Sequence, residues 1–297
     1  MKPGFWMAPE DAESPVVLQP IADAADELCR PGTTGTGALS FLATTGAEAM
    51  IARCPGVAAL LPRIVTALET QTADAPGLLF DLASPGASPG AGLGAEEVTL
   101  VGEVLGEGEV SAMVALPDGI VAQIQESVLA GLWRVRFTDA EGRLIADYAE
   151  VSAIPQAVRR AAAMTLADFT IGTPPEGAMN VMPVLAEIRD RVRRRQPGDA
   201  AHTISLSLLP MTPQDIEFLQ ESLGTGPVRI VSKGYGSCRI QATAIHGVWS
   251  VQFFNTMDTI LLDTLEIGHV PIVACAAEED FRDSAVRLRE IEDAYFR

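Results

Sequence analysis

The sequence predicts an α+β protein made of two tandem copies of one unit, in which an αβα segment precedes an antiparallel meander and the helices pack on one face of each sheet. The first observation behind this prediction is a heptapeptide, GLWRVRF at residues 131–137, that returns as GVWSVQF at residues 247–253. Apolar and polar residues alternate in both, which is typical of a half-buried strand. The second observation is that the likeness continues on either side of the strand.

The spacing of the two tryptophans recurs at other positions of the chain. Trp133 and Trp249 are 116 residues apart, and the same spacing joins further identical pairs. These pairs are Phe137 and Phe253, Asp147 and Asp263, Glu150 and Glu266, and Pro155 and Pro271. Upstream, LGEGEV at residue 105 matches LGTGPV at residue 223, so the first copy holds two extra residues near its LPDG turn. Because loops tolerate insertions, a period near 120 residues indicates a duplicated domain.

These matches predict the organisation of the whole chain. Residues 1–55 have no counterpart and form a partly irregular N-terminal extension. The remaining segments are the first copy at 56–157, a connector at 158–179, the second copy at 180–275 and a C-terminal helix at 276–297.

Each copy begins with a helix, because apolar residues recur at three- and four-residue spacing. The residues concerned are Leu60, Leu61, Ile64 and Leu68 in the first copy, and Val184, Leu185, Ile188 and Val192 in the second. A short apolar strand follows. The segment MTPQDIEFLQESLG then predicts a second helix with Thr212 as its N-cap, Pro213 in the first turn, Asp215 near the positive end of the dipole and Gly224 as terminator.

Four short alternating segments complete the unit and predict the meander. In the second copy they cover residues 228–232, 238–245, 248–254 and 259–267, separated by KGYG, HG and NTMD. In the first copy the corresponding breaks are LPDG, AG and DAEG. Such residues favour the tight turns of β-hairpins.

The composition limits the classes of partner. A formal net charge of −18 argues against nucleic acid and against an anionic membrane surface, and it suits a basic peptide segment. No apolar run is long enough for a transmembrane helix, and the N-terminal residues do not resemble a signal peptide. The four cysteines are far apart without a CxxC pair. We therefore expect a cytoplasmic protein with free thiols, no membrane insertion, no cofactor and no metal site.

Reactive side chains differ between the copies. Cys238, His246 and His269 of the second copy replace alanines of the first, so an alternative function is a ligand-binding, metal-binding or thiol-active protein with a pocket between the two repeats. Against this, a cysteine at the start of a strand is more often a small buried hydrophobe. The basic run RDRVRRR at residues 189–195 indicates a helix end, where it complements the dipole and pairs internally or with an acidic partner.

Residues 208–271 resemble the C-terminal conserved region of the HupH/HyaF family of hydrogenase expression and formation proteins. The likeness lies in GYGSCRI at residue 234, VWSVQFFN at residue 248, MDTILLDTLE at residue 257 and the closing VP. LGEGEVSA and GLWRVRF of the first copy fit the weaker first copy of this family.

The resemblance implies a non-enzymatic, chaperone-like accessory protein for the maturation of nickel–iron uptake hydrogenase. It would bind the iron–sulfur small subunit precursor, including its twin-arginine leader, before export, and would meet other maturation proteins. The implied partner-binding residues are Tyr235, Cys238, Arg239, Asn255, Met257 and Asp258. Two interpretations of these residues remain open: they stabilise turns and strands, or they form one rim that faces the partner.

Overall fold

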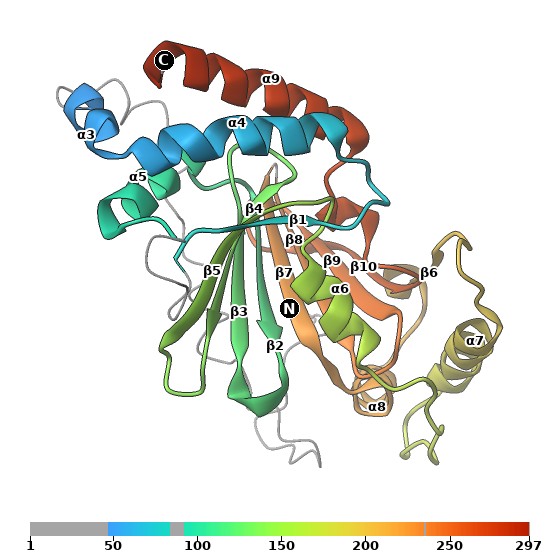
Figure 1. Ribbon diagram of the computed structural model, residues 1–297. Helices are drawn as coiled ribbons and strands as arrows, with labels where there is room; N and C mark the ends of the chain where they lie inside the picture. The colour runs from blue at the N-terminus through green and yellow to red at the C-terminus, as the bar shows by residue number, and fades with distance from the viewer. Residues whose placement is uncertain (1–46, 84–91, 235, 297) are drawn as a thin grey trace. The chain divides into compact units, whose positions relative to one another are not determined.

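The computed structural model of the chain describes residues 47–83, 92–234 and 236–296 (Figure 1). These residues divide into two units by their internal contacts. The N-terminal unit contains residues 47–157 and 275–296, and the C-terminal unit contains residues 158–274. Both combine helices with antiparallel strands, which confirms the predicted α+β class. Within the described residues, no helix has the length and apolar character needed to cross a membrane.

The N-terminal unit follows the predicted order of a helix, a strand, a helix and a meander. Its elements are α3 (Ala47–Arg53), α4 (Pro55–Thr70), β1 (Leu78–Asp81), α5 (Ala95–Leu105), β2 (Val110–Ala115), η1 (Pro117–Gly119), β3 (Val121–Glu126), β4 (Leu132–Thr138), β5 (Leu144–Val151) and α9 (Glu278–Tyr295). Of the predicted extension, only α3 and its neighbours lie in the described residues.

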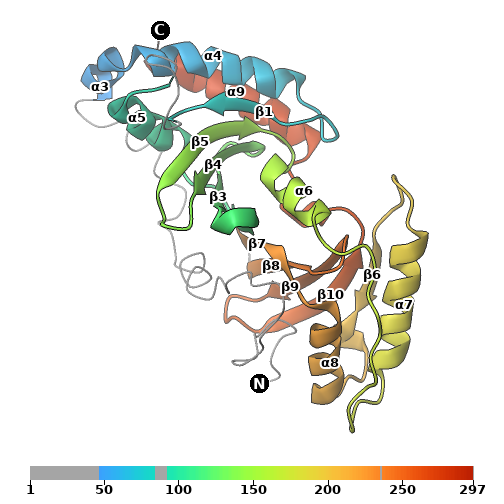
Figure 2. The same cartoon turned by 60° about the horizontal axis from the view of Figure 1, so that its bottom comes forward.

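The sheet of the N-terminal unit has the order β1-β5-β4-β3-β2, and neighbouring strands are antiparallel. One face carries Leu132 and Val151, which join buried residues of α4, α5 and α9 in a single apolar core. Helices α4 and α9 run side by side in both views (Figures 1 and 2). The helices of this core therefore cover one sheet face.

Helix α9, at the end of the chain, packs into the N-terminal unit. Phe281 is fully buried in the core there, and the Ser284 hydroxyl donates a hydrogen bond to the Ala130 carbonyl at 2.9 Å. Gly131 has a positive φ of 82°, and a Cβ at this position would lie only 2.4 Å from the Phe281 ring. The tail was predicted as a helix, but its packing against the first half of the chain was not predicted.

The C-terminal unit has the corresponding order of elements. They are α6 (Gln156–Ala163), which begins two residues before the unit, α7 (Val181–Arg194), β6 (His202–Ser205), η2 (Leu206–Leu208), α8 (Pro213–Leu223), β7 (Thr225–Gly234), β8 (Gly236–Thr243), β9 (Val248–Phe254), β10 (Ile260–Ile267) and η3 (Ile272–Ala274).

The sheet of the C-terminal unit has the order β7-β8-β9-β10-β6, again antiparallel. Its face with Val248 and Leu265 packs with buried residues of α7 and α8, which lie side by side in Figure 2. The predicted start of α8 is confirmed: Thr212 caps the helix and accepts from the Asp215 N–H. Gly224 ends it with a φ of 61°.

Equivalent polar contacts hold the two meanders. In each unit the Nε2 of one buried or half-buried glutamine lies within hydrogen-bond distance of three main-chain carbonyls, to which its two N–H groups donate. The donors and acceptors are Gln125 with Gly108, Val110 and Glu126, and Gln241 with Gly226, Val228 and Ala242. The two glutamines are 116 residues apart, which is the spacing of the two tryptophans.

Candidate functional site

The site residues predicted from the sequence belong to the tips of two neighbouring hairpins, β7–β8 and β9–β10. We call residues 236–239 and 254–259 the hairpin rim. Cys238 and Arg239 lie near the start of β8, and Asn255, Met257 and Asp258 form the turn between β9 and β10. Tyr235 lies outside the described residues.

Asn255 shapes the turn of the rim. Its side-chain Oδ1 accepts hydrogen bonds from the N–H groups of Met257 and Thr259, both at 2.9 Å. Asp258 has a positive φ of 57°, a conformation that asparagine, aspartate and glycine adopt most readily. This turn leaves the Met257 side chain 81% exposed at its tip. The prediction that Asn255 and Asp258 close a hairpin is confirmed.

Arg239 connects the two hairpins of the rim. Its Nη2 donates to Asp258 Oδ1 at 2.9 Å, and its guanidinium lies 4.3 Å from the centre of the Phe254 ring. An exposed ion pair contributes about 0–1 kcal/mol, and a surface cation–π contact adds a similar amount. These two contacts therefore add little to the free energy of unfolding. Their effect is to link the start of β8 to the turn between β9 and β10.

Gly236 allows the two hairpins to come close together. Its φ is 99°, and a Cβ there would lie 2.3 Å from the Phe254 carbonyl oxygen. Because that contact is with backbone, a larger residue would displace the strand itself. The second glycine of GYGSCRI, Gly236, is thus required by the structure of the rim.

Cys238 does not have the environment of a reactive thiol. Burial, together with the charge of Glu266, raises its pKa to about 12, so the thiol stays protonated at neutral pH. His246 follows the opposite end of β8, and residues 238–243 alone span about 16 Å in an extended strand. The Nδ1 and Nε2 atoms of His246 instead contact the Ala162 carbonyl and Arg195, and His269 is exposed. The structure thus does not bring Cys238 and His246 together.

No three His, Cys, Asp or Glu side chains of the described residues are grouped so that they could hold a metal ion.

Four leucines of η2, the residue after it and β10 are exposed, and the sequence did not predict them as site residues. Leu208 of η2 is 83% exposed and Leu261 of β10 is 64% exposed, and Leu209 and Leu262 are also exposed. The Asp263 N–H donates to the Ser207 hydroxyl at 2.8 Å, which holds η2 against β10. We call Met257 and these four leucines the rim patch. A signal was available, because three consecutive apolar residues at 260–262 interrupt the alternation expected of a half-buried strand.

The fold and the rim define a protein of two α+β units with an exposed, partly apolar surface on the C-terminal one. The family model described as "HupH hydrogenase expression protein, C-terminal conserved region" matches residues 90–169 and 178–295. The chain belongs to this family of hydrogenase expression proteins.

Named relatives agree with the family model. The chain is 51% identical over 297 residues to the hydrogenase expression/formation protein HupH of Rhizobium leguminosarum bv. viciae, with both chains fully covered. It is 37% identical to the hydrogenase-1 operon protein HyaF of Escherichia coli K12, over 67% of this chain and 70% of that one. A solved structure of the hydrogenase expression protein HupH from Thiobacillus denitrificans is 30% identical and covers 38% of this chain and 96% of its own, with a TM-score of 0.35.

Proposed function

We propose that this protein acts in hydrogenase maturation as a chaperone-like accessory protein that holds the iron–sulfur small subunit precursor before export. Membership of the hydrogenase expression protein family is the observation that carries the proposal. In this proposal the protein is not an enzyme and needs no cofactor. It works in the cytoplasm, where the precursor exists before export, together with other maturation proteins.

The rim patch supports docking of a protein chain at this surface. Met257, Leu208 and Leu261 expose large apolar side chains, and Met257 belongs to the same turn as Asp258, which pairs with Arg239. Apolar side chains surrounded by polar groups are typical of protein-binding surfaces, and methionine adapts to partners of different shape. The net charge of −18 would attract a basic leader segment over a longer range.

We also infer that the chain arose by doubling of one unit, with copies at 56–157 and 180–275. The match of one family model to two segments supports this, as do the corresponding strand orders and the matching glutamine contacts. In this alignment Met257 of the rim corresponds to Glu141 of the first copy, so only the second copy has the apolar tip.

Removing apolar character from the rim patch tests the proposed docking. We expect Met257→Asp combined with Leu261→Asp to reduce capture of the small subunit precursor at least tenfold, because burial of one such side chain contributes roughly 1.5–3 kcal/mol. The measurement is affinity capture of the tagged full-length protein from cells that make the hydrogenase, with the precursor quantified by immunoblot.

Met164→Asp is the matched control, because Met164 is also exposed but lies after α6, away from the rim in sequence. All three substitutions are at exposed positions, so thermal unfolding should be unchanged. Equal capture by the double variant, the control and the wild type would refute docking at the rim patch.

A further inference from the structure

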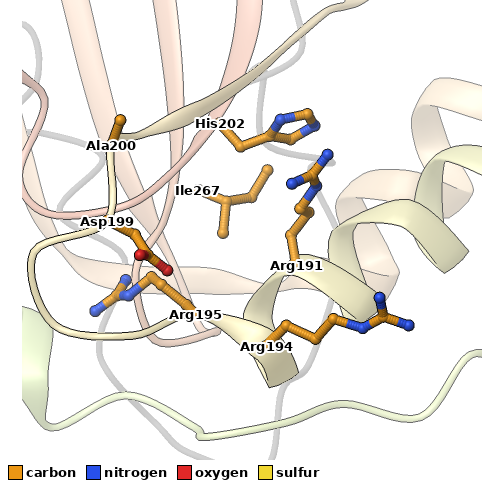
Figure 3. Close-up of a pocket in the computed structure, with 7 residues that line it drawn as sticks. All are labelled: Arg191, Arg194, Arg195, Asp199, Ala200, His202 and Ile267. Atoms are coloured by element: carbon orange, nitrogen blue, oxygen red, sulfur yellow. The ribbon is translucent and has the colours of Figure 1, made fainter.

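A basic pocket lies on the C-terminal unit, at the far end of β10 from the rim (Figure 3). Its volume is about 350 Å³, and its lining comes from the end of α7, the loop after it and the adjoining strands. The lining residues are Arg191, Arg194, Arg195, Asp199, Ala200, His202 and Ile267. With three arginines and one aspartate, the lining of the pocket has a net positive charge, although the chain as a whole has a net charge of −18.

The end of α7 and its C-cap residue, Arg195, provide two of these arginines. Arg191 and Arg195 are four residues apart, and the Arg195 N–H donates to the Arg191 carbonyl at 3.0 Å as the helix ends. In Figure 3 the Arg191 side chain extends toward His202, whereas Arg194 points away from Ile267. Arg191 and Arg195 are therefore the two cations that flank the cavity.

Arg195 is held in place by hydrogen bonds. Its Nη1 donates to the Gly268 carbonyl at 2.6 Å, and its Nη2 lies 3.4 Å from His246 Nε2. The Nδ1 of His246 is 3.1 Å from the Ala162 carbonyl, which can only accept, so Nδ1 carries the proton and Nε2 accepts from Arg195. An arginine fixed in this way loses less entropy when it binds a ligand.

Arg191 differs from the other arginines of α7 in having no acidic partner. Arg189 and Arg193 both pair with Asp168, and Arg194 pairs with Asp190. Among the described residues, Arg191 forms no ion pair. The acid of the pocket, Asp199, is engaged in its own loop, where Oδ2 accepts from the Gln196 N–H at 2.8 Å.

Stabilisation of the helix end explains only part of this arrangement. Cations near a helix C-terminus complement the dipole by about 0.3–1 kcal/mol wherever they point. That effect requires neither a cavity nor an arginine held by a carbonyl and a histidine. A cavity of about 350 Å³ is also within the range of pockets that hold small ligands.

We propose that the basic pocket binds an oxyanion group, a carboxylate or a phosphate, between Arg191 and Arg195. Guanidinium groups bind both through paired N–H donors. The group can be carried by a free anion or by the acidic side chains of a protein segment. The pocket is separate from the rim, so this inference does not depend on the proposed docking of the small subunit.

The test is calorimetric titration of the full-length protein at low salt with three probes: inorganic phosphate, citrate and a hexaglutamate peptide. The proposal predicts saturable binding of at least one probe, weakened fivefold or more by Arg191→Gln. Arg194→Gln, which changes the net charge equally, should weaken binding less than twofold. Selective binding of hexaglutamate assigns the site to a protein segment, and selective binding of phosphate or citrate assigns it to a free anion.

Two results would overturn the proposal. One is the absence of saturable binding of all three probes by the wild-type protein. The other is equal weakening by Arg191→Gln and Arg194→Gln, which would reduce the effect to overall charge. Both arginines are exposed, so retention of the wild-type unfolding temperature checks that the variants are folded.

Discussion

Glu126 is a buried carboxyl group in the N-terminal sheet, opposite Trp133 in the register of β3 and β4. Burial raises its pKa to about 7, although the Gly131 N–H acts in the opposite direction, and the charge of Asp280 raises it further. The folded protein therefore holds a proton that the unfolded chain releases near pH 4.5.

The raised pKa of Glu126 predicts a stability that falls as pH rises from about 4.5 to 7. Across this range the free energy of unfolding falls by about 3 kcal/mol, and it does not recover above pH 7. Glu126→Gln keeps a hydrogen-bond acceptor for Gly131 but cannot ionise. We expect this variant to be more stable than the wild type at pH 8, with a smaller difference at pH 5, in urea unfolding at both pH values. Glu141→Gln, at an exposed position, is the control, and an identical pH dependence of all three proteins would contradict the prediction.

At the residue scale, turn chemistry was the most predictable part of the site. Asparagine and aspartate in NTMD are residues that close hairpins, and Asn255 and Asp258 do so. Contacts of Arg239 with Phe254 and Asp258 could not be predicted, because they depend on how β8 lies against β9 and its turn. The partner-binding role of the rim residues remains a prediction.

At the scale of elements, one acidic residue organises the start of two helices in each unit. Asp215 accepts from Thr212 at the start of α8 through Oδ2 and from the N–H groups of residues 179–181 at the start of α7 through Oδ1. Glu97 likewise accepts from Gly94 at the start of α5 and from Gly56 at the start of α4. Each carboxylate satisfies N–H groups that a helix start leaves without partners.

Loss of this carboxylate should destabilise the C-terminal unit. We expect Asp215→Ala to reduce the free energy of unfolding by about 2–4 kcal/mol, because several buried N–H groups lose their acceptor. Glu217→Ala, at an exposed position of the same helix, should change it by less than about 0.5 kcal/mol. Burial alone raises the pKa of Asp215, but the hydrogen bonds it accepts outweigh burial and lower the pKa. Its contribution is therefore present at neutral pH and lost as pH falls through the folded-state pKa.

The free energies of unfolding of the Asp215→Ala and Glu217→Ala variants are measured by denaturant unfolding at pH 7. Equal destabilisation by the two substitutions would show that Asp215 acts only as one more charge near a helix start.

The sequence predicted the cap of α8 from TPQD, because the local pattern specifies it. It could not predict that Asp215 also reaches α7, since that contact joins residues more than 30 positions apart.

At the scale of the whole molecule, the path of the last helix was the least predictable feature. The acidic residues at the start of the tail indicated a helix, which is α9, but they did not specify what the helix packs against. Phe281 and Leu288 are buried in the core of the N-terminal unit, so the end of the chain completes the fold of its first half. An apolar sequence pattern shows that a helix face is buried, but it does not show which other apolar surface covers that face. That choice depends on the shapes of the two surfaces.

The inferred duplication also yields a control within the same chain. Asp139 Oδ1 accepts from the N–H groups of Glu141 and Arg143, the same turn geometry that Asn255 forms with Met257 and Thr259. The two hairpin tips thus have corresponding backbone contacts but different side chains, a carboxylate at residue 141 and an apolar thioether at residue 257.

Photo-crosslinking from these two positions tests the account most directly. A photoreactive amino acid is placed at residue 257 or at residue 141 in cells that make the hydrogenase, and the crosslinked products are identified by mass spectrometry. The account predicts that position 257 forms a product with the small subunit precursor and that position 141 forms little or none. Precursor products of equal yield from both positions, or none from position 257, would contradict the claim that the C-terminal unit holds the immature subunit.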